Sequence, residues 1–239
     1  MQPDIQIKLL ELTRHSRRIS LSELAQGLRA GPATLTSQVE ELRSKGLVTF
    51  SQEQIELDSR QRIMLAEELI HSGRDPQRVS RFLEWQEFEN FAALSFEENG
   101  FYTAKHVVFK TGAGRREVDM FAWNDTFLFA VDCKHWLRGF SPARMRDAVQ
   151  AQVERTTAMA DRPELLVKIG VMHPGRRNIV PVIFALGNPR QPVVDGVPVV
   201  SVSKLVSFLY GISPVDERFR SFPVKNSGTA TLFGEQPKP

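Results

Sequence analysis

The side chains best suited to chemistry lie in two apolar, strand-like segments, EVDMFAW and FLFAVDCKHW. A two-residue turn at 124–125 would join them as a hairpin and set Asp119 opposite Ala130. Side chains alternate along a strand, so Asp119, Asp132 and Lys134 are expected on one face of the sheet. Two carboxylates and one ammonium exceed what a single buried ion pair requires. The pattern therefore predicts a functional site on this hairpin.

A third carboxylate, Glu89, lies on the apolar stripe of a helix predicted over residues 78–99. The apolar members of that stripe are Trp85, Ala92 and Phe96. A carboxylate inside such a stripe is costly unless it is paired or binds a cation. The other acidic residues of the segment fall off the stripe and are expected to face solvent: Glu84, Glu87, Glu97 and Glu98.

Together these residues indicate metal-dependent hydrolysis of a phosphodiester bond. Carboxylate oxygens are the ligands that Mg²⁺ prefers, and they leave positions open for water and a phosphate. The metal activates water and neutralises charge on the phosphate. A neighbouring lysine can orient or deprotonate the attacking water. We expect Mg²⁺ as the cofactor, with Mn²⁺ able to replace it.

Glu89, then Asp119, then Asp132-Cys133-Lys134 resembles the PD-(D/E)XK restriction-endonuclease-like superfamily. The stretches FENFAALSFEENGF, REVDM and FAVDCKHW resemble its Mrr-like and archaeal Holliday-junction-resolvase branches, over about residues 80–210. The resemblance implies that Asp119 and Asp132 ligate Mg²⁺, that Glu89 aids the metal site and that Lys134 serves the water. Val118 stands where the superfamily name has proline.

The helix expected after the hairpin, over residues 144–160, carries two further candidates. Related nucleases place a glutamine near the site from this helix, and either Gln150 or Gln152 could fill that place. Arg115 and Arg116 precede Asp119 and either contact DNA phosphates or form a solvated loop. Glu117 shares the strand face of Asp119 but is expected to lie apart from the site.

The elements that would position these residues form two predicted domains. Residues 1–75 read as helix, short helix, turn, helix and two short strands, which resembles a winged helix-turn-helix domain. The resemblance implies that the helix from Pro32 enters a DNA groove. Its candidate DNA contacts are Thr34, Gln38 and Arg43. The net charge of −1 over this region favours the alternative, a dimerisation or protein-binding role.

Residues 76–220 are expected to form the nuclease-like domain. Strands over 165–172, 180–186 and from 196 onward are interspersed with helices, and the last helix ends near Gly211. This pattern predicts an α/β fold with a mixed central sheet flanked by helices. Residues 221–239 are expected to be a flexible tail.

Composition limits the function classes. The chain has 239 residues, a net charge of +3 and one cysteine, which excludes an intramolecular disulfide. It lacks an apolar run long enough to span a membrane and a signal peptide, so the expected location is the cytoplasm. Residues 134–190 hold ten basic and four acidic side chains, which favours a polyanionic partner.

The sequence thus predicts a Mg²⁺-dependent deoxyribonuclease of the restriction or DNA-repair type. Two alternatives stay open: a structure-specific resolvase of the Holliday-junction type, and a DNA-binding regulator with an inactive nuclease fold. A homodimer is expected because one such site cuts one strand, so that cutting both strands favours two-fold symmetry.

Overall fold

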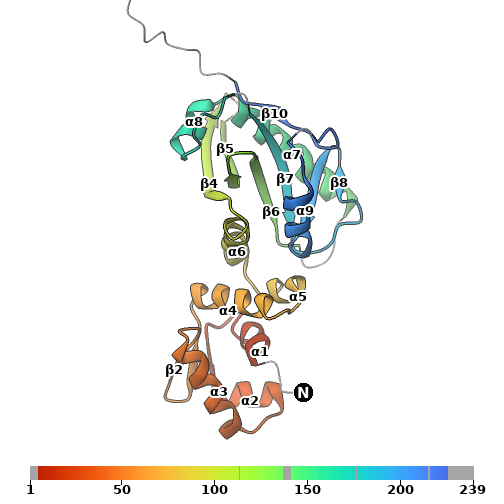
Figure 1. Cartoon of the computed structure of the whole chain (residues 1–239). Helices are drawn as coiled ribbons and strands as arrows, with labels where there is room; N and C mark the ends of the chain where they lie inside the picture. Colours follow the sequence, from red (N-terminus) through yellow and green to blue (C-terminus); the bar gives the residue numbers. More distant parts are fainter. Residues whose placement is uncertain (1–4, 113, 137–140, 176, 215, 226–239) are drawn as a thin grey trace, which may run out of the picture.

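The computed structural model describes residues 5–112, 114–136, 141–175, 177–214 and 216–225. These residues form an N-terminal unit with a three-stranded sheet and a larger unit with a seven-stranded mixed sheet (Figure 1). The predicted α/β class, with a mixed central sheet flanked by helices, is confirmed.

The N-terminal unit contains the three helices and two short strands predicted from the sequence, and it adds a third strand over Arg18–Ser20 that was not predicted. Its helices are α1 (Ile5–Leu12), α2 (Leu21–Leu28) and α3 (Pro32–Ser44), and its strands are β1 (Arg18–Ser20), β2 (Thr49–Ser51) and β3 (Gln54–Glu56). The sheet order is β1-β3-β2. Helix α2 begins at a capping box, in which the Ser20 hydroxyl accepts from the Glu23 backbone and the Glu23 carboxylate accepts from the Ser20 backbone. Pro32 opens α3, where its missing N–H costs nothing.

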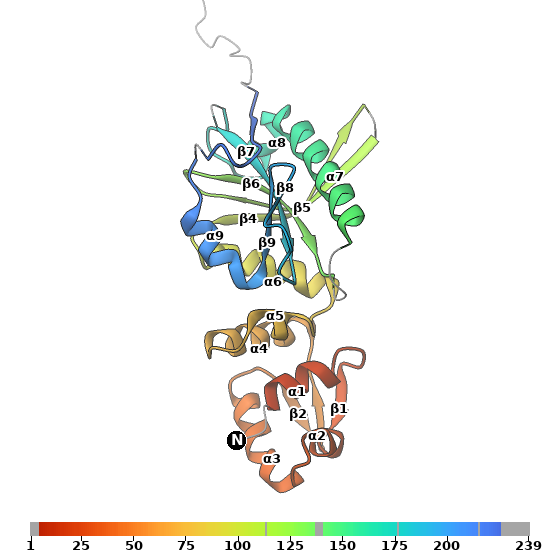
Figure 2. The ribbon, with the colours of Figure 1, turned by 90° about the vertical axis from the view of Figure 1, so that its right-hand side faces the viewer.

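Three helices connect this unit to the large sheet: α4 (Ser59–His71), α5 (Pro76–Ser80) and α6 (Trp85–Glu97). The single helix predicted over 78–99 is therefore divided into two. A new helix begins at Trp85, and the Glu84 backbone donates to the Glu87 carboxylate just before it. In Figures 1 and 2, α4 and α5 lie between the N-terminal unit and α6.

A buried ion pair joins α4 to α6. The guanidinium of Arg62 is fully buried, and its Nε donates to Glu87 Oε1 at 3.0 Å. Its other nitrogens donate to the Leu10 and Phe82 carbonyls and to the Thr13 hydroxyl. The expectation that Glu87 faces solvent is wrong. Its carboxylate is buried, and the pairing with Arg62 makes that burial possible.

The large sheet runs in the order β4-β5-β6-β7-β9-β8, and β10 pairs with β7. Its strands are β4 (Tyr102–Thr111), β5 (Gly114–Trp123), β6 (Leu128–Lys134), β7 (Asn178–Ala185), β8 (Val193–Val194), β9 (Val197–Ser201) and β10 (Phe222–Pro223). The first three strands pair antiparallel, whereas β6, β7 and β9 run parallel.

Helices cover both faces of this sheet. The remaining helices of this unit are α7 (Pro142–Ala160), α8 (Pro163–Lys168), the 3-10 turn η1 (Val202–Lys204) and α9 (Leu205–Gly211). Figure 2 shows α7 on one side and α6 with α9 on the other. Phe96 of α6 packs in one core with Phe129 and Val131, while Met159 of α7 packs in another with Phe121 and Ala130. The strand residues thus alternate between the two cores.

Two predicted segments differ from the structure. The strand expected over 165–172 is instead α8 followed by a turn, because Pro163 starts a helix well and Gly170 then adopts a positive φ. The tail expected from 221 is wrong for residues 222–224, since Phe222 pairs with Ile179 and Val224 is buried. The rest of that predicted tail, 226–239, lies outside the described residues.

Across the described ranges, no helix combines the length and the apolar character needed to cross a membrane.

Candidate active site

The hairpin of β5 and β6 has a longer turn than predicted. The side chain of Asn124 accepts from the backbones of Thr126 and Phe127, and Trp123 pairs with Leu128. The predicted two-residue turn is therefore wrong, and the register is shifted by two residues. An even shift keeps each side chain on its face, so Asp119 and Asp132 remain on the same side.

Asp119 and Asp132 lie where the two strands separate. The last backbone pair of the β5–β6 ladder is Met120 with Val131, and each aspartate is the next residue beyond it. The backbone N–H of Cys133 donates to Asp119 Oδ2 at 2.9 Å. The Asp119 side chain thus takes the place of a backbone acceptor, which fixes its carboxylate at the mouth of the fork.

The Asp119 carboxyl is held in an unfavourable environment for its charge. Burial, and then the nearby Asp132 carboxylate, raise its pKa to about 6. The Cys133 N–H and Lys134 act in the opposite direction, while Glu89 adds to the rise. A buried carboxyl whose pKa is raised in part by a second carboxylate is typical of a functional site.

Asp132 is buried and has two cationic neighbours. Arg155 donates to Asp132 Oδ1 at 2.6 Å, and Lys134 Nζ lies 2.7 Å from Oδ2. The ammonium is close but not aligned for a hydrogen bond, so Oδ2 is a buried acceptor without one. The Lys134 ammonium compensates the charge of Oδ2, and the oxygen keeps the capacity to accept a further ligand.

Helix α7 contributes Gln152 and Arg155 to this cluster. Gln152 is fully buried; its Nε2 donates to the Ala130 carbonyl at 2.7 Å, and its Oε1 accepts from Arg155 Nε at 2.9 Å. Gln150 is exposed and donates to Glu154 instead. Of the two predicted glutamines, Gln152 therefore lies at the sheet, where it orients Arg155. Sequence reasoning missed Arg155; its position three residues after Gln152, on the same helix face, was the available signal.

Glu89 reaches the same region from α6. Its side chain is buried, as predicted, although Trp85 on the expected stripe is 43% exposed. Burial raises the pKa of the Glu89 carboxyl, while His106 and a hydrogen bond from the Trp85 side chain lower it. Lys134 Nζ lies 5.8 Å from the centre of the Trp85 ring. Trp85 therefore lies close to both Glu89 and Lys134.

Glu117 is closer to the site than predicted. His106 of β4 lies between it and Glu89, with Nδ1 at 3.1 Å from Glu117 Oε1 and Nε2 at 3.7 Å from Glu89 Oε2. Glu117 thus belongs to the surroundings of Glu89, and His106 is a second residue that sequence reasoning missed.

The donor set fits Mg²⁺ in part. Across the described residues, no group of three or more His, Cys, Asp or Glu side chains is arranged to hold a metal ion. Mg²⁺ is, however, usually held by one or two carboxylates, with water and substrate phosphates as its other ligands. Asp119 and the unbonded Oδ2 of Asp132 meet that requirement, and Glu89 adds a third carboxylate nearby.

The predicted DNA contacts are not gathered at the carboxylates. Arg115 is exposed, and Arg116 is half-buried on the outer part of β5. Thr34, Gln38 and Arg43 lie on α3 in the N-terminal unit. Arg43 is paired with Glu40 at 3.0 Å, which neutralises its charge locally.

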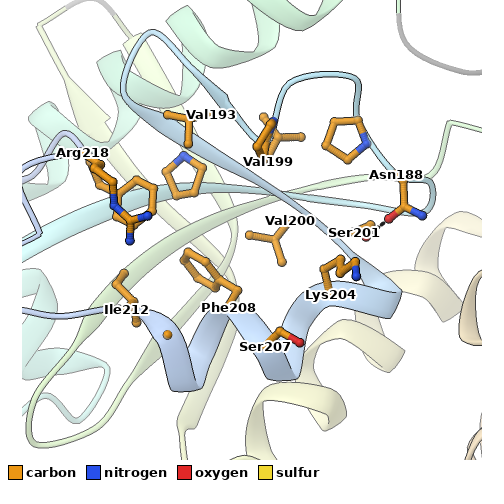
Figure 3. Close-up of a pocket in the computed structure, with 15 residues that line it drawn as sticks. Asn188, Val193, Val199, Val200, Ser201, Lys204, Ser207, Phe208, Ile212 and Arg218 are labelled. Atoms are coloured by element: carbon orange, nitrogen blue, oxygen red, sulfur yellow. Dashed lines mark hydrogen bonds between the residues drawn. The ribbon is translucent and has the colours of Figure 1, made fainter.

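A cavity of about 540 Å³ lies elsewhere, between β9, α9 and the segment around Phe219. Figure 3 shows Val200, Phe208 and Ile212 pointing into it, with Lys204 beside the Asn188–Ser201 hydrogen bond. This cavity is not lined by Glu89, Asp119, Asp132 or Lys134. The chemistry-bearing side chains lie at the β5–β6 fork rather than in this cavity.

Comparisons with known proteins add little to this geometry. No protein-family model and no curated protein matches the chain. Two solved structures are similar: a protein of unknown function, AF1548, with 19% identity over 48% of this chain and 56% of that one, TM-score 0.32; and VC1899 from Vibrio cholerae, with 12% identity over 84% of this chain and 47% of that one, TM-score 0.39. The chain spans about half the length of each.

Proposed function

We propose that the protein is a Mg²⁺-dependent deoxyribonuclease of the PD-(D/E)XK restriction-endonuclease-like type. The observation that carries the proposal is the pair of aspartates at the fork. Asp132 Oδ2 is buried without a hydrogen bond, and the neighbouring Asp119 carboxyl has a pKa raised to about 6. Both properties are those of ligands that await a divalent cation.

Asp119 and Asp132 would hold the cation, with Glu89 as the third carboxylate. When bound, Mg²⁺ neutralises charge at the phosphate and makes water a stronger nucleophile. Mn²⁺ takes the same oxygen ligands and is expected to replace it.

The cationic side chains have separate roles in this proposal. Lys134 lies against Asp132, from where its ammonium can orient the attacking water, or its neutral amine can accept the proton of that water. Arg155 is fixed by Gln152 and presents its guanidinium beside the same carboxylate. Guanidinium groups match the geometry of phosphate oxygens. In this proposal Arg155 would leave Asp132 and bind a phosphate of the DNA instead.

One observation favours a second candidate, a DNA-binding regulator with an inactive nuclease fold. Lys134 and Arg155 already balance the charge of Asp132. Among the described residues no three-ligand metal group is assembled. Such a site would hold its fold together without a metal and would bind DNA without cutting it.

DNA is the proposed partner because basic residues dominate 134–190. We further propose a homodimer, since two sites are needed to cut both strands in one binding event. Sedimentation of the protein alone and with DNA tests this, and a monomer in both states would contradict it. The single cysteine and the DNA substrate together favour the cytoplasm as the place of action.

Incubation of the purified protein with linear, single-stranded, methylated and four-way DNA tests the function. Cleavage with Mg²⁺ and none with EDTA is the expected result. Preference for the four-way substrate would identify the resolvase alternative. Tight DNA binding without cleavage of any substrate, in either Mg²⁺ or Mn²⁺, would contradict the nuclease and favour the regulator.

A further inference from the structure

His106 has an unusual backbone conformation for its place in the fold. It lies in the middle of β4, yet its φ is +52°, in the left-handed region. Residues other than glycine enter this region at a steric cost, and such residues are concentrated at functional sites. A glycine would adopt this conformation freely, so the histidine side chain needs a reason to be there.

The left-handed residue marks a break in the β4–β5 ladder. Lys105 pairs with Met120 and Val107 pairs with Val118, so His106 lies opposite Asp119 without a backbone pair. Met120 packs in the core on the α6 side, whereas Val118 packs with Val107 in the core on the α7 side.

This result corrects the expected strand pattern. In a regular strand Val118 would share the face of Met120, two residues away, but the break at Asp119 changes the alternation and turns Val118 to the other core. Figure 2 shows the outer ends of β4 and β5 turned away from the sheet beside α7. The bend is what opens the fork at Asp119.

The His106 side chain occupies the inside of this bend. Its two ring nitrogens face two carboxylates, Glu117 at 3.1 Å and Glu89 at 3.7 Å. The Trp85 side chain bonds the Glu89 carboxyl as well. Glu89 is thus confined by His106 and Trp85, while Asp119 stands directly across from His106.

We propose that His106 is a positioning residue for Glu89: its left-handed backbone holds the imidazole between Glu117 and Glu89 and so fixes the Glu89 carboxylate beside the Asp119–Asp132 pair. This inference rests on the proposed function, in which Glu89 is the third carboxylate of the metal site. A residue that orients a ligand in this way typically changes metal affinity or activity about 10- to 100-fold when it is lost.

Two substitutions separate positioning from folding. His106→Gly and His106→Asn both tolerate the left-handed backbone, so neither should lower the melting temperature. Neither side chain can bridge the two carboxylates. The matched control is His71→Ala, because His71 is an exposed histidine 3.5 Å from Glu98, with no part in the site.

The measurements are Mn²⁺ affinity by calorimetry, thermal unfolding, and DNA cleavage as a function of Mg²⁺. Both His106 variants should bind Mn²⁺ about 10-fold more weakly and need about 10-fold more Mg²⁺ for half-maximal cleavage. Their KM for DNA should stay within about twofold of the parent, and high Mg²⁺ should restore most of kcat. His71→Ala should match the parent in every readout.

Two results would overturn the inference while leaving the nuclease intact: variants with the parent's Mn²⁺ affinity and Mg²⁺ requirement, or variants whose losses follow a lowered melting temperature and are not restored by Mg²⁺. A parent protein that neither binds Mn²⁺ nor cuts DNA would instead remove the proposed function, and this inference with it.

Discussion

Two buried ionic clusters in this molecule solve the same physical problem differently. The Arg62 cluster, made of Arg62, Glu87 and Arg17, joins the N-terminal unit to α6. The Asp132 cluster, made of Asp119, Asp132, Lys134 and Arg155, lies at the fork of β5 and β6. Both remove charges from water, which is costly unless each charge is paired and hydrogen-bonded.

The Arg62 cluster is complete. Every guanidinium nitrogen of Arg62 has an acceptor, and Glu87 accepts from Arg62, from Arg17 and from the Glu84 backbone. The Asp132 cluster is incomplete, because Oδ2 of Asp132 makes no hydrogen bond and the Asp119 carboxyl has a raised pKa. The comparison teaches that incomplete satisfaction, rather than burial of charge as such, distinguishes a candidate functional site from a structural one.

The largest expected effect is on the rate of DNA cleavage, and it tests whether the Asp132 cluster is functional rather than structural. Asp132→Asn and Lys134→Ala should each slow cleavage about 100- to 10,000-fold, as expected for a lost acid–base or charge-stabilising group. Their metal affinities should differ. Asp132→Asn removes a ligand and should bind Mn²⁺ weakly, whereas Lys134→Ala removes a cation 2.7 Å from Asp132 and should bind at least as tightly as the parent.

Calorimetric Mn²⁺ titration beside cleavage rates distinguishes these two losses. If Asp132→Asn binds Mn²⁺ like the parent and still cuts, Asp132 is not a ligand and the two clusters are alike in being structural.

The opposite dependence is expected for the Arg62 cluster. Arg62→Met should cost about 3–5 kcal/mol of unfolding free energy, because it leaves the Glu87 carboxylate and the Leu10 and Phe82 carbonyls without their buried partner. Denaturant unfolding measures this loss. Arg18→Met, which breaks an exposed pair with Glu56, should cost no more than about 1 kcal/mol. Equal costs for the two variants would show that the Arg62 cluster contributes no more than a surface pair.

Asp119 gives a pH-dependent version of the comparison. The fold raises the pKa of the Asp119 carboxyl from its ordinary value of 3.8 to about 6. A raised folded-state pKa means that the fold is favoured by the protonated carboxyl, so this contribution is full below pH 3.8 and is lost as the pH rises through about 6. Asp119→Asn cannot ionise and should stabilise the metal-free protein at pH 7 by about 1–3 kcal/mol.

Urea unfolding in EDTA between pH 4 and 7 measures this effect. Asp147→Asn, at an exposed position of α7, is the matched substitution. If the gain of Asp119→Asn is as large at pH 4 as at pH 7, titration of Asp119 is not its cause.

The smallest effect is expected at α3. Arg43 is already paired with Glu40, so Arg43→Ala should weaken DNA binding by no more than about fivefold, the range of an exposed charge contact. Fluorescence anisotropy at several salt concentrations measures it, with Lys8→Ala on α1, which is likewise paired with a glutamate, as the control. If Arg43→Ala weakened DNA binding as much as substitution of a residue of the Asp132 cluster, the main DNA contact would lie in the N-terminal unit.

Local patterns predicted much of the fold. A cap and a proline placed α2 and α3, alternation placed β5 and β6, and an apolar run placed β7, because these signals act within a few residues. The sequence pattern also placed Glu89, Asp119, Asp132 and Lys134 in or beside one site. Their burial follows from the apolar residues around them.

Effects of single side chains on the backbone and long-range contacts were beyond reach. The Asn124 side chain stabilised a longer turn than a two-residue hairpin through bonds to its near neighbours Thr126 and Phe127, and His106 changed the alternation at Val118. Glu87 was misjudged because its partner Arg62 is far away in sequence. Arg155 was missed because helix spacing alone does not say which side chain reaches across to a sheet.

The apolar core offers one last consequence. A single cluster of buried residues includes Leu69 of α4, Val79 of α5, Leu83 between α5 and α6, and Phe88 of α6, so it continues across the predicted boundary near residue 75. The N-terminal unit is therefore not an interchangeable module. Genetic exchange at that boundary would expose apolar surface and leave Glu87 without Arg62, so a viable chimera must inherit α4, α5 and α6 together.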